Sequence, residues 1–247
     1  MYKPIFIAGP CVIETFDILE EVAKELVRLN NKYGINIIFK SSFDKANRTS
    51  LHSYRGPNLE KGLTMLNDIK MKYGLSLLTD IHEPYQAEIV GGIVDVIKIP
   101  AFLCRQTDLL VAAKIINIKK AQFLSGQDMK YPVEKVRETG NANVWLTERG
   151  NTFGYNNLVV DFRNIPDMCS ITPHVIMDCT HSVQRPGADG GKTGGNREYV
   201  PAMALAAKAF GATGYFFEVH PNPDMALSDG PNMLYLKDLE KVICSLL

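Results

Sequence analysis

The chain has 247 residues, and its 27 Lys and Arg residues balance its 27 Asp and Glu residues, so its formal net charge is zero. With 46% hydrophobic and 22% charged residues, it has the composition of an ordinary globular protein. A neutral chain lacks the basic surface that binds nucleic acid or anionic membranes, and no apolar run approaches the ~18 residues that span a bilayer. These features argue against nucleic-acid and membrane partners. The apolar stretch near the N-terminus is too short for a signal peptide, which predicts a cytoplasmic protein.

Short β-branched runs alternate with longer amphipathic stretches along the whole chain. The predicted strands are Ile5–Ala8, Ile35–Lys40, Leu75–Thr79, Val94–Ile99, Ile115–Lys119, Val144–Thr147, His174–Asp178 and Gly214–Glu218. The predicted helices are Ile18–Asn30, Asn58–Tyr73, Arg105–Ala113, Tyr199–Phe210 and Leu236–Leu246, with a weaker helical pattern over Tyr155–Arg163. Eight strand–helix units in about 250 residues predict one (β/α)8 TIM barrel domain over residues 1–247. A doubly wound open sheet would give the same local pattern, but the strand count favours the barrel.

The longest irregular stretch is predicted at Ser182–Arg197, which is rich in glycine. It follows the seventh strand and so lies on the catalytic face of a barrel. Loops of this length in compact domains are usually functional lids or mobile segments.

Cationic side chains gather after several predicted strands, at the end where barrel enzymes build their active sites. They are Lys40, Lys45, Arg48, Lys119 and Arg149. Unpaired at one mouth they would repel one another, so they predict a small anionic ligand. Because Arg offers a planar fork and Lys a point charge, the mixture suits a ligand with both carboxylate and phosphate groups. The alternative is that they form solvated ion pairs with Asp44, Asp80, Glu83 or Glu148.

A second set of residues at the strand ends has the chemistry of metal ligands: Cys11, His181, Glu218 and Asp229. A thiolate, an imidazole and two carboxylates suit Zn²⁺, Fe²⁺, Mn²⁺ or Co²⁺ better than Mg²⁺ or Ca²⁺. The four share no local spacing motif, and an isolated cysteine is often a small buried hydrophobe. From the residues alone, both interpretations of Cys11 stay open.

Several long segments resemble the 3-deoxy-D-manno-octulosonate 8-phosphate synthases (KDO8P synthases). They are Ile7–Cys11, Phe39–Arg48, Ile99–Asp108, Arg149–Leu158, Asp178–Gln184 and Phe217–Pro221, followed by Leu227–Asp229. The resemblance covers essentially the whole chain in order. It implies a TIM barrel enzyme that condenses phosphoenolpyruvate with arabinose 5-phosphate and water, giving the octulosonate phosphate and inorganic phosphate for lipopolysaccharide assembly.

The resemblance also implies roles for individual residues. Phosphoenolpyruvate is expected at Lys40, Lys45, Lys119 and Arg149, with Ser42 and Gln122 nearby, and Lys119 is a candidate proton donor. Arabinose 5-phosphate is expected at Asn47 and Arg48, with its sugar or aldehyde near Asp80 and His82. Its phosphate would also be reached by Arg105 from a neighbouring subunit, so we expect a homo-oligomer, a homotetramer by family resemblance.

The family divides into metal-dependent members, with Cys after Gly-Pro, and metal-independent members, with Asn there. Cys11 in this chain implies the metal-dependent class, with Cys11, His181, Glu218 and Asp229 as ligands of a divalent metal ion (Zn, Fe, Mn or Co). His181, Asp229 and Cys11 are therefore expected to be catalytic through the ion and its water.

The chain departs from this family at one junction. Family members carry several more residues between the helix after Arg105 and the strand ending in Lys119. Because a helix-to-strand turn usually takes two to six residues, we predict that residues are missing between Ala113 and Ile115.

Three other functions remain as alternatives. A 3-deoxy-heptulosonate phosphate synthase would use erythrose 4-phosphate, although those enzymes carry Lys-Pro-Arg where this chain has Lys45-Ala46-Asn47-Arg48. A Schiff-base aldolase would use Lys119 or Lys40 as a desolvated amine. A barrel that binds phosphosugars without catalysis is the third.

Overall fold

Eight parallel strands close into a barrel in the computed structural model, which describes residues 3–113, 115–189 and 192–247. The strands are β1 (Ile5–Gly9), β2 (Ile37–Lys40), β3 (Leu77–Asp80), β4 (Val96–Ile99), β5 (Ile116–Lys119), β6 (Val144–Glu148), β9 (His174–Asp178) and β12 (Gly214–His220). Each pairs with the next, and β12 pairs back to β1, with Ile5 opposite Gly214 and Gly9 opposite Glu218. An open sheet would leave β1 and β12 apart, so the predicted TIM barrel is confirmed.

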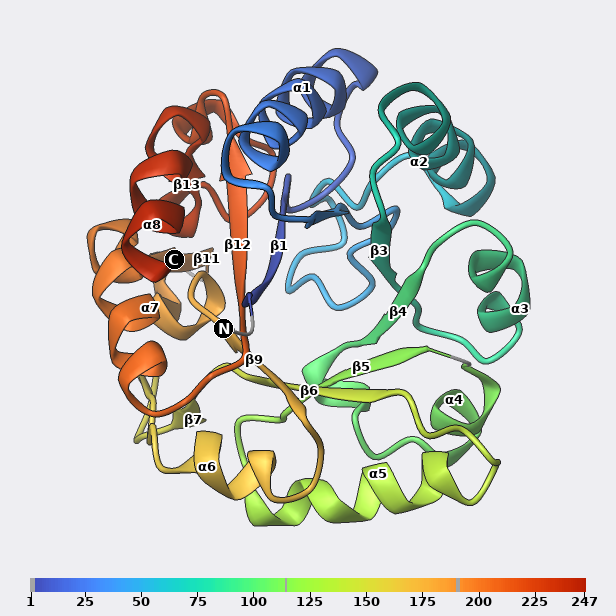
Figure 1. Ribbon diagram of the computed structural model, residues 1–247, viewed down its shortest axis with the longest axis vertical. Helices are drawn as coiled ribbons and strands as arrows, with labels where there is room; N and C mark the ends of the chain where they lie inside the picture. Colours follow the sequence, from blue (N-terminus) through green and yellow to red (C-terminus); the bar gives the residue numbers. More distant parts are fainter. Residues whose placement is uncertain (1–2, 114, 190–191) are drawn as a thin grey trace.

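Helices follow the barrel strands and form an outer ring (Figure 1). They are α1 (Phe16–Tyr33), α2 (Leu59–Tyr73), α3 (Gln86–Gly91), α4 (Thr107–Ala112), α5 (Lys130–Arg137), α6 (Asn164–Cys169), α7 (Val200–Ala209) and α8 (Leu239–Leu246). The long α1 begins where the Thr15 side chain accepts a hydrogen bond from the Ile18 N–H, and it ends at Gly34, whose φ of 58° is left-handed. In the part of the chain described, no helix is long and apolar enough to cross a membrane.

The weak helix expected over Tyr155–Arg163 is wrong. Strand β8 (Leu158–Val159) occupies that stretch and pairs antiparallel with β7 (Asn151–Thr152), while the sixth helix begins later, at Asn164. A β-branched run that meets a partner strand favours extended backbone over helix. Pro166 fits the later helix because it falls in the first turn, where a missing N–H costs little.

The stretch Ser182–Arg197 is more regular than its glycines indicate. It contains β10 (Gln184–Asp189) and β11 (Lys192–Gly195), which pair antiparallel with Gln184 opposite Gly195. Gly195 is required by packing, since a Cβ there would lie 1.5 Å from Asn232 Oδ1. Gly195 therefore allows β11 to pack closely against Asn232 at the catalytic end of the barrel.

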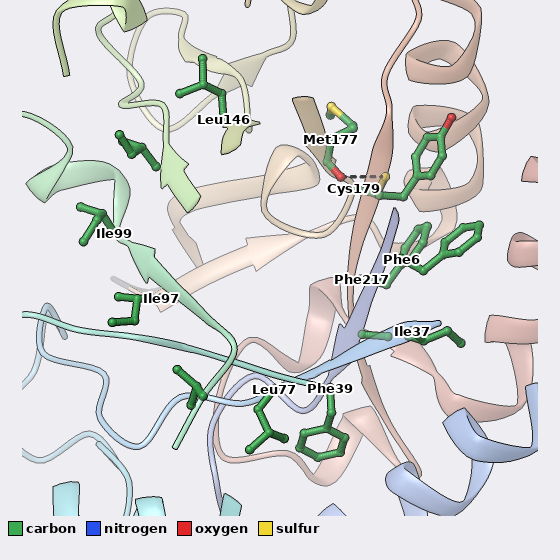
Figure 2. Packing of buried hydrophobic residues seen from close by; sticks show 14 of the residues in the cluster. Phe6, Ile37, Phe39, Leu77, Ile97, Ile99, Leu146, Met177, Cys179 and Phe217 are labelled. Carbon is green, nitrogen blue, oxygen red and sulfur yellow. Dashed lines mark hydrogen bonds between the residues drawn. The ribbon is translucent and has the colours of Figure 1, made fainter. Parts of the chain in front are cut away.

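Alternation along the strands divides the core into two apolar layers. Residues facing outward, such as Phe6, Phe39, Leu77 and Phe217, pack against the helices (Figure 2). Residues facing inward form a separate cluster inside the barrel: Ile7, Ile38, Leu78, Val96, Ile176 and Phe216. The residue two positions after each of these faces the same way. In the same strand order these residues are Gly9, Lys40, Asp80, Lys98, Asp178 and Glu218. The same alternation therefore places these mostly charged residues in a ring next to the inner apolar cluster, toward the carboxyl ends of the strands.

The junction between α4 and β5 runs through Lys114, which lies outside the described residues. Helix α4 ends at Ala112, and β5 begins at Ile116. The prediction that residues are missing between Ala113 and Ile115 stays a prediction.

Candidate active site

A cavity of about 1020 Å³ opens at the carboxyl ends of the barrel strands. The cationic residues singled out in the sequence all line it: Lys40, Lys45, Arg48, Lys119 and Arg149. Its lining also includes six other candidate residues: Asn47, Asp80, His82, Gln122, His181 and Asp229. The barrel thus brings residues from across the sequence to one chamber.

Two buried lysines of this cavity have close carboxylate partners, but these are not the acids considered from the sequence. Lys40 Nζ lies 3.0 Å from Glu218 Oε1, and Lys119 Nζ lies 2.5 Å from Asp178 Oδ2. Of the four acids considered, Asp80 alone approaches these cations, at 4.0 Å from Lys40 Nζ, within the described chain. These are buried pairs, so the solvated ion-pair alternative does not describe them.

Two of the acids that the sequence offered as partners are engaged elsewhere. Asp44 pairs with Arg55, at 2.5 Å from its Nη2. Glu148 accepts hydrogen bonds from the backbone N–H groups of Arg149 and Gly150 and lies 3.3 Å from Lys120 Nζ. Neither carboxylate neutralises a cation that lines the cavity.

Several polar atoms of the site are buried without a hydrogen-bond partner among the described residues. They are Arg149 Nε, Gln122 Oε1, His82 Nδ1 and Glu218 Oε2. An unsatisfied buried polar group costs roughly 1–3 kcal/mol, so a folded protein keeps it where a ligand, ion or water completes it. The site is built to be completed by a polar ligand.

Three of the four predicted metal donors come together where the barrel closes, and the fourth, His181, lies beside two of them. Ligand atoms of Cys11, Glu218 and Asp229 all lie within 4.8 Å of one another. His181 Nε2 lies 3.5 Å from Glu218 Oε2 and 3.7 Å from Asp229 Oδ2. His181 thus faces two members of the group from the end of β9.

Asp178 orients the imidazole of His181. Its Oδ2 lies 2.7 Å from His181 Nδ1, and its Oδ1 accepts the His181 backbone N–H at 2.8 Å. A carboxylate that holds one ring nitrogen directs the other toward a metal. Burial lowers the pKa of His181, although Asp178 opposes the shift, and a neutral imidazole is the form that binds metals.

The environment of Cys11 also suits a cation. Burial, and then the negative charge of Glu218, raises the pKa of the Cys11 thiol above its ordinary value. The thiol donates to Asp229 Oδ2 at 3.4 Å, and Glu218 Oε2 has no hydrogen-bond partner among the described side chains. A thiolate beside two carboxylates needs a positive charge between them. The donor set therefore fits a divalent ion of the zinc, iron, manganese or cobalt type.

Residues 2–247 match the DAHP synthetase I family. The chain belongs to this family. It is 53% identical to the 2-dehydro-3-deoxyphosphooctonate aldolase of Fusobacterium nucleatum, over 97% of this chain and 87% of that protein. The proteins of the same name from a Cyanothece species and from Campylobacter jejuni subsp. doylei are 54% and 52% identical, covering 98% and 100% of this chain and 90% and 98% of their own lengths.

The remaining candidate residues of this DAHP synthetase I family member take different positions. Arg48 donates to Ser228 Oγ at 2.6 Å and to the Tyr54 carbonyl at 3.1 Å. Ser42 does not line the cavity but donates to Asp80 Oδ1 at 2.6 Å, and so acts on the site through that carboxylate. Arg105 is exposed and does not line the cavity of its own barrel.

Gln184 and Lys98 are among the cavity residues that the sequence analysis did not single out. Gln184, at the start of β10, donates to Asp229 Oδ1 at 3.0 Å and accepts from Arg149 at 2.9 Å, so it joins the cationic side of the site to the metal-donor side. Lys98 lies in β4, one residue before the strand end, and also lines the cavity. Lys98 could have been identified from the alternation of side chains along β4, because it lies two residues after the inward-facing Val96.

Proposed function

We propose that this protein condenses phosphoenolpyruvate with D-arabinose 5-phosphate and water, giving 3-deoxy-D-manno-octulosonate 8-phosphate and inorganic phosphate for lipopolysaccharide biosynthesis. The observation that carries the proposal is the cavity lined by Lys40, Lys45, Arg48, Lys119 and Arg149, since both substrates are phosphorylated and one is also a carboxylate. Relatives that cover nearly the whole chain carry the name 2-dehydro-3-deoxyphosphooctonate aldolase, which names the same octulosonate phosphate chemistry.

In the reaction, C3 of phosphoenolpyruvate attacks the sugar aldehyde, water adds at C2, and the C2–O bond to phosphate breaks. Charge moves onto the phosphate and carboxylate side as this happens. Lys119 and Arg149 are buried and held by Asp178 and by Gln184, so they meet that charge without reorganising. The cavity also holds the two substrates at one place, which removes much of the entropic cost of bringing them together.

We assign the chain to the metal-dependent class, with Cys11, His181, Glu218 and Asp229 as ligands of a Zn, Fe, Mn or Co ion. Such an ion, when bound, polarises a carbonyl oxygen or lowers the pKa of a water molecule. The chain's own part is to aim the donors: Asp178 fixes the His181 ring, and Gln184 holds Asp229. Support for the assignment comes from the meeting of the donors and from the unpartnered Glu218 oxygen among the described side chains.

We assign the sugar to Asn47, Arg48, Asp80 and His82, which all line the cavity. The match to the DAHP synthetase I family keeps one alternative in view, the heptulosonate synthase that uses erythrose 4-phosphate. Asn47 favours the pentose phosphate, since the heptulosonate enzymes carry Lys-Pro-Arg in this segment. We further propose that residues 1–247 act as a single catalytic domain and that the protein is cytoplasmic.

Phosphate release tests the function directly. We expect inorganic phosphate to appear from phosphoenolpyruvate only when arabinose 5-phosphate is also present, in a one-to-one ratio with the new 3-deoxy sugar acid. Erythrose 4-phosphate in place of the pentose should give a much lower kcat/KM. If no phosphate is released with either sugar, the alternative of a barrel that binds phosphosugars without catalysis is favoured. A preference for erythrose 4-phosphate would favour the heptulosonate synthase.

Arg105 tests the proposed assembly. Its side chain is exposed on its own barrel, so we propose that it reaches the sugar phosphate of a neighbouring subunit in a homotetramer. Arg105→Ala should weaken arabinose 5-phosphate binding by about 1.5–3 kcal/mol, the value of one charge-assisted hydrogen bond, and leave phosphoenolpyruvate binding nearly unchanged. The measurement is the KM for each substrate, with Arg163→Ala as the control because Arg163 pairs with Asp161 at the surface. A fully active monomer by light scattering would contradict the assembly.

A further inference from the structure

Lys98 is a buried lysine of the active-site cavity that the reaction scheme above does not use. It lies in β4, and its side chain is only 4% exposed. Its Nζ lies 3.9 Å from the centroid of the Phe216 ring, the residue of β12 at the top of the inner apolar cluster. The amine therefore lies at the boundary between the inner apolar cluster and the active-site cavity.

Charged groups from four other strands of the barrel act on Lys98. Lys40 on β2 and Lys119 on β5 are cations, and their Nζ atoms lie 5.4 and 5.8 Å from the same Phe216 ring centroid. Asp80 on β3 and Asp178 on β9 are the carboxylates. Three lysines thus share one aromatic ring, and two of them have a close carboxylate partner.

The two carboxylates are engaged by other residues. Asp80 accepts from Ser42 at 2.6 Å, and Asp178 contacts Lys119 at 2.5 Å and His181 at 2.7 Å. Among the described residues, none places a carboxylate oxygen within 4.0 Å of Lys98 Nζ, and none makes a hydrogen bond with it. Burial, and then the positive charges of Lys119 and Lys40, lowers the pKa of Lys98 well below its usual range. Burial without a close carboxylate, next to two other cations, therefore makes a charged amine costly at this position in the free protein.

We infer that Lys98 is a further binding residue for the anionic substrate, and that its amine takes up a proton from solvent when phosphoenolpyruvate enters the cavity. The inference rests on the proposed function for the identity of the anion. A bound phosphate or carboxylate supplies the negative charge that Lys98 lacks, and the face of Phe216 stabilises the ammonium that forms. An uncharged Lys98 also spares the empty site the repulsion of a third cation next to Lys40 and Lys119.

Calorimetry with phosphoenolpyruvate alone tests this proton uptake. The metal-loaded protein is titrated at pH 8 in two buffers of different ionisation enthalpy, and the difference in heat gives the protons taken up per site. We expect net proton uptake in the wild type, up to about one proton per site. Lys98→Met should bind roughly 10- to 100-fold more weakly, the effect of one charge-assisted hydrogen bond, and should lose the uptake.

Lys98→Arg separates charge from protonation. A guanidinium is always charged, so this variant should bind phosphoenolpyruvate within a few-fold of the wild type and still lose the uptake. Lys241→Met, at an exposed lysine of α8, is the control and should leave both affinity and uptake unchanged. Metal content and melting temperature, measured on every variant, identify any change that comes from altered loading or folding.

The outcomes distinguish this inference from the proposed function. Wild-type uptake in Lys98→Arg, or wild-type affinity in Lys98→Met, would overturn the role of Lys98 even if the protein makes the octulosonate phosphate. Conversely, uptake lost in both Lys98 variants, in a protein that forms no product from the two substrates, would support the anion-binding role and refute the proposed reaction.

Discussion

Exhaustive chelation is expected to abolish turnover, and added Mn²⁺, Co²⁺ or Zn²⁺ is expected to restore it. Ligand atoms of Cys11, Glu218 and Asp229 lie within 4.8 Å of one another, and His181 faces two of them. Without a cation, a buried thiol beside two carboxylates stays protonated and cannot act as a thiolate. The measurements are the rate of phosphate release and the bound metal per chain, before and after chelation.

Cys11→Ala should be inactive and should stay so when metal is added. The loss of a ligand should exceed the ~10- to 100-fold effects that outer-shell partners of metal ligands produce. Cys104→Ala is the matched control, because Cys104 is also buried but does not belong to the metal-donor group. It should lose some stability through packing while keeping its metal and its rate.

The fold should survive loss of the metal. The apolar layers are made by residues such as Phe6, Phe39 and Ile176, none of which is a donor. Circular dichroism of the chelated protein should therefore match that of the loaded protein, with a lower melting temperature because a bound ion stabilises the folded state. Full activity of Cys11→Ala after exhaustive chelation would show that this cysteine only fills space.

The barrel could be predicted from the sequence because each strand is a short β-branched run with its own boundaries. Predicted and observed strands differ by only one or two residues at their ends, as at Ile37, where β2 begins two residues later than expected. The two errors concern segments whose structure depends on distant partners. Leu158–Val159 is extended because it pairs with β7, and Gly195 is in a strand because it pairs with Gln184 of β10. Local periodicity contains neither contact.

The site could be predicted less completely. Cys11 and Asp229 are 218 positions apart, and only closure of β1 against β12 brings them together. No local spacing marks such a pair, so family resemblance carried that prediction. Lys98 was missed because the sequence analysis considered the polar residues at the end of each strand. Strand β4 ends at Ile99, which faces outward, and the inward-facing residue is Lys98, one position earlier. Arg105 needs a second chain, which the sequence of one chain does not place.

Lys119→Gln is expected to lower kcat/KM for phosphoenolpyruvate by about 10²- to 10⁴-fold, the range for a positioned proton-transfer or charge-stabilising group. Its ammonium is buried in the cavity and paired with Asp178 Oδ2 at 2.5 Å. The substitution should leave the metal site intact, because Asp178 still holds His181 through the ring nitrogen and the backbone N–H. Normal metal content beside a lost rate would separate this effect from that of Cys11→Ala.

The adjacent Lys120 is the matched control for Lys119. Successive residues at the end of β5 face opposite sides, so Lys120 points away from the cavity, donates to the Leu124 carbonyl and Asn151 Oδ1, and lies 3.3 Å from Glu148. Lys120→Met leaves a buried carboxylate without its cation and should cost about 3–5 kcal/mol of stability, measured by denaturant unfolding, with kcat/KM changed only a few-fold in the folded fraction. The opposite pattern, a Lys119→Gln enzyme within tenfold of the wild type, would remove Lys119 from the reaction.

Borohydride reduction in the presence of substrate should leave Lys119 and Lys40 unmodified, since a trapped adduct on either amine would establish the Schiff-base aldolase instead.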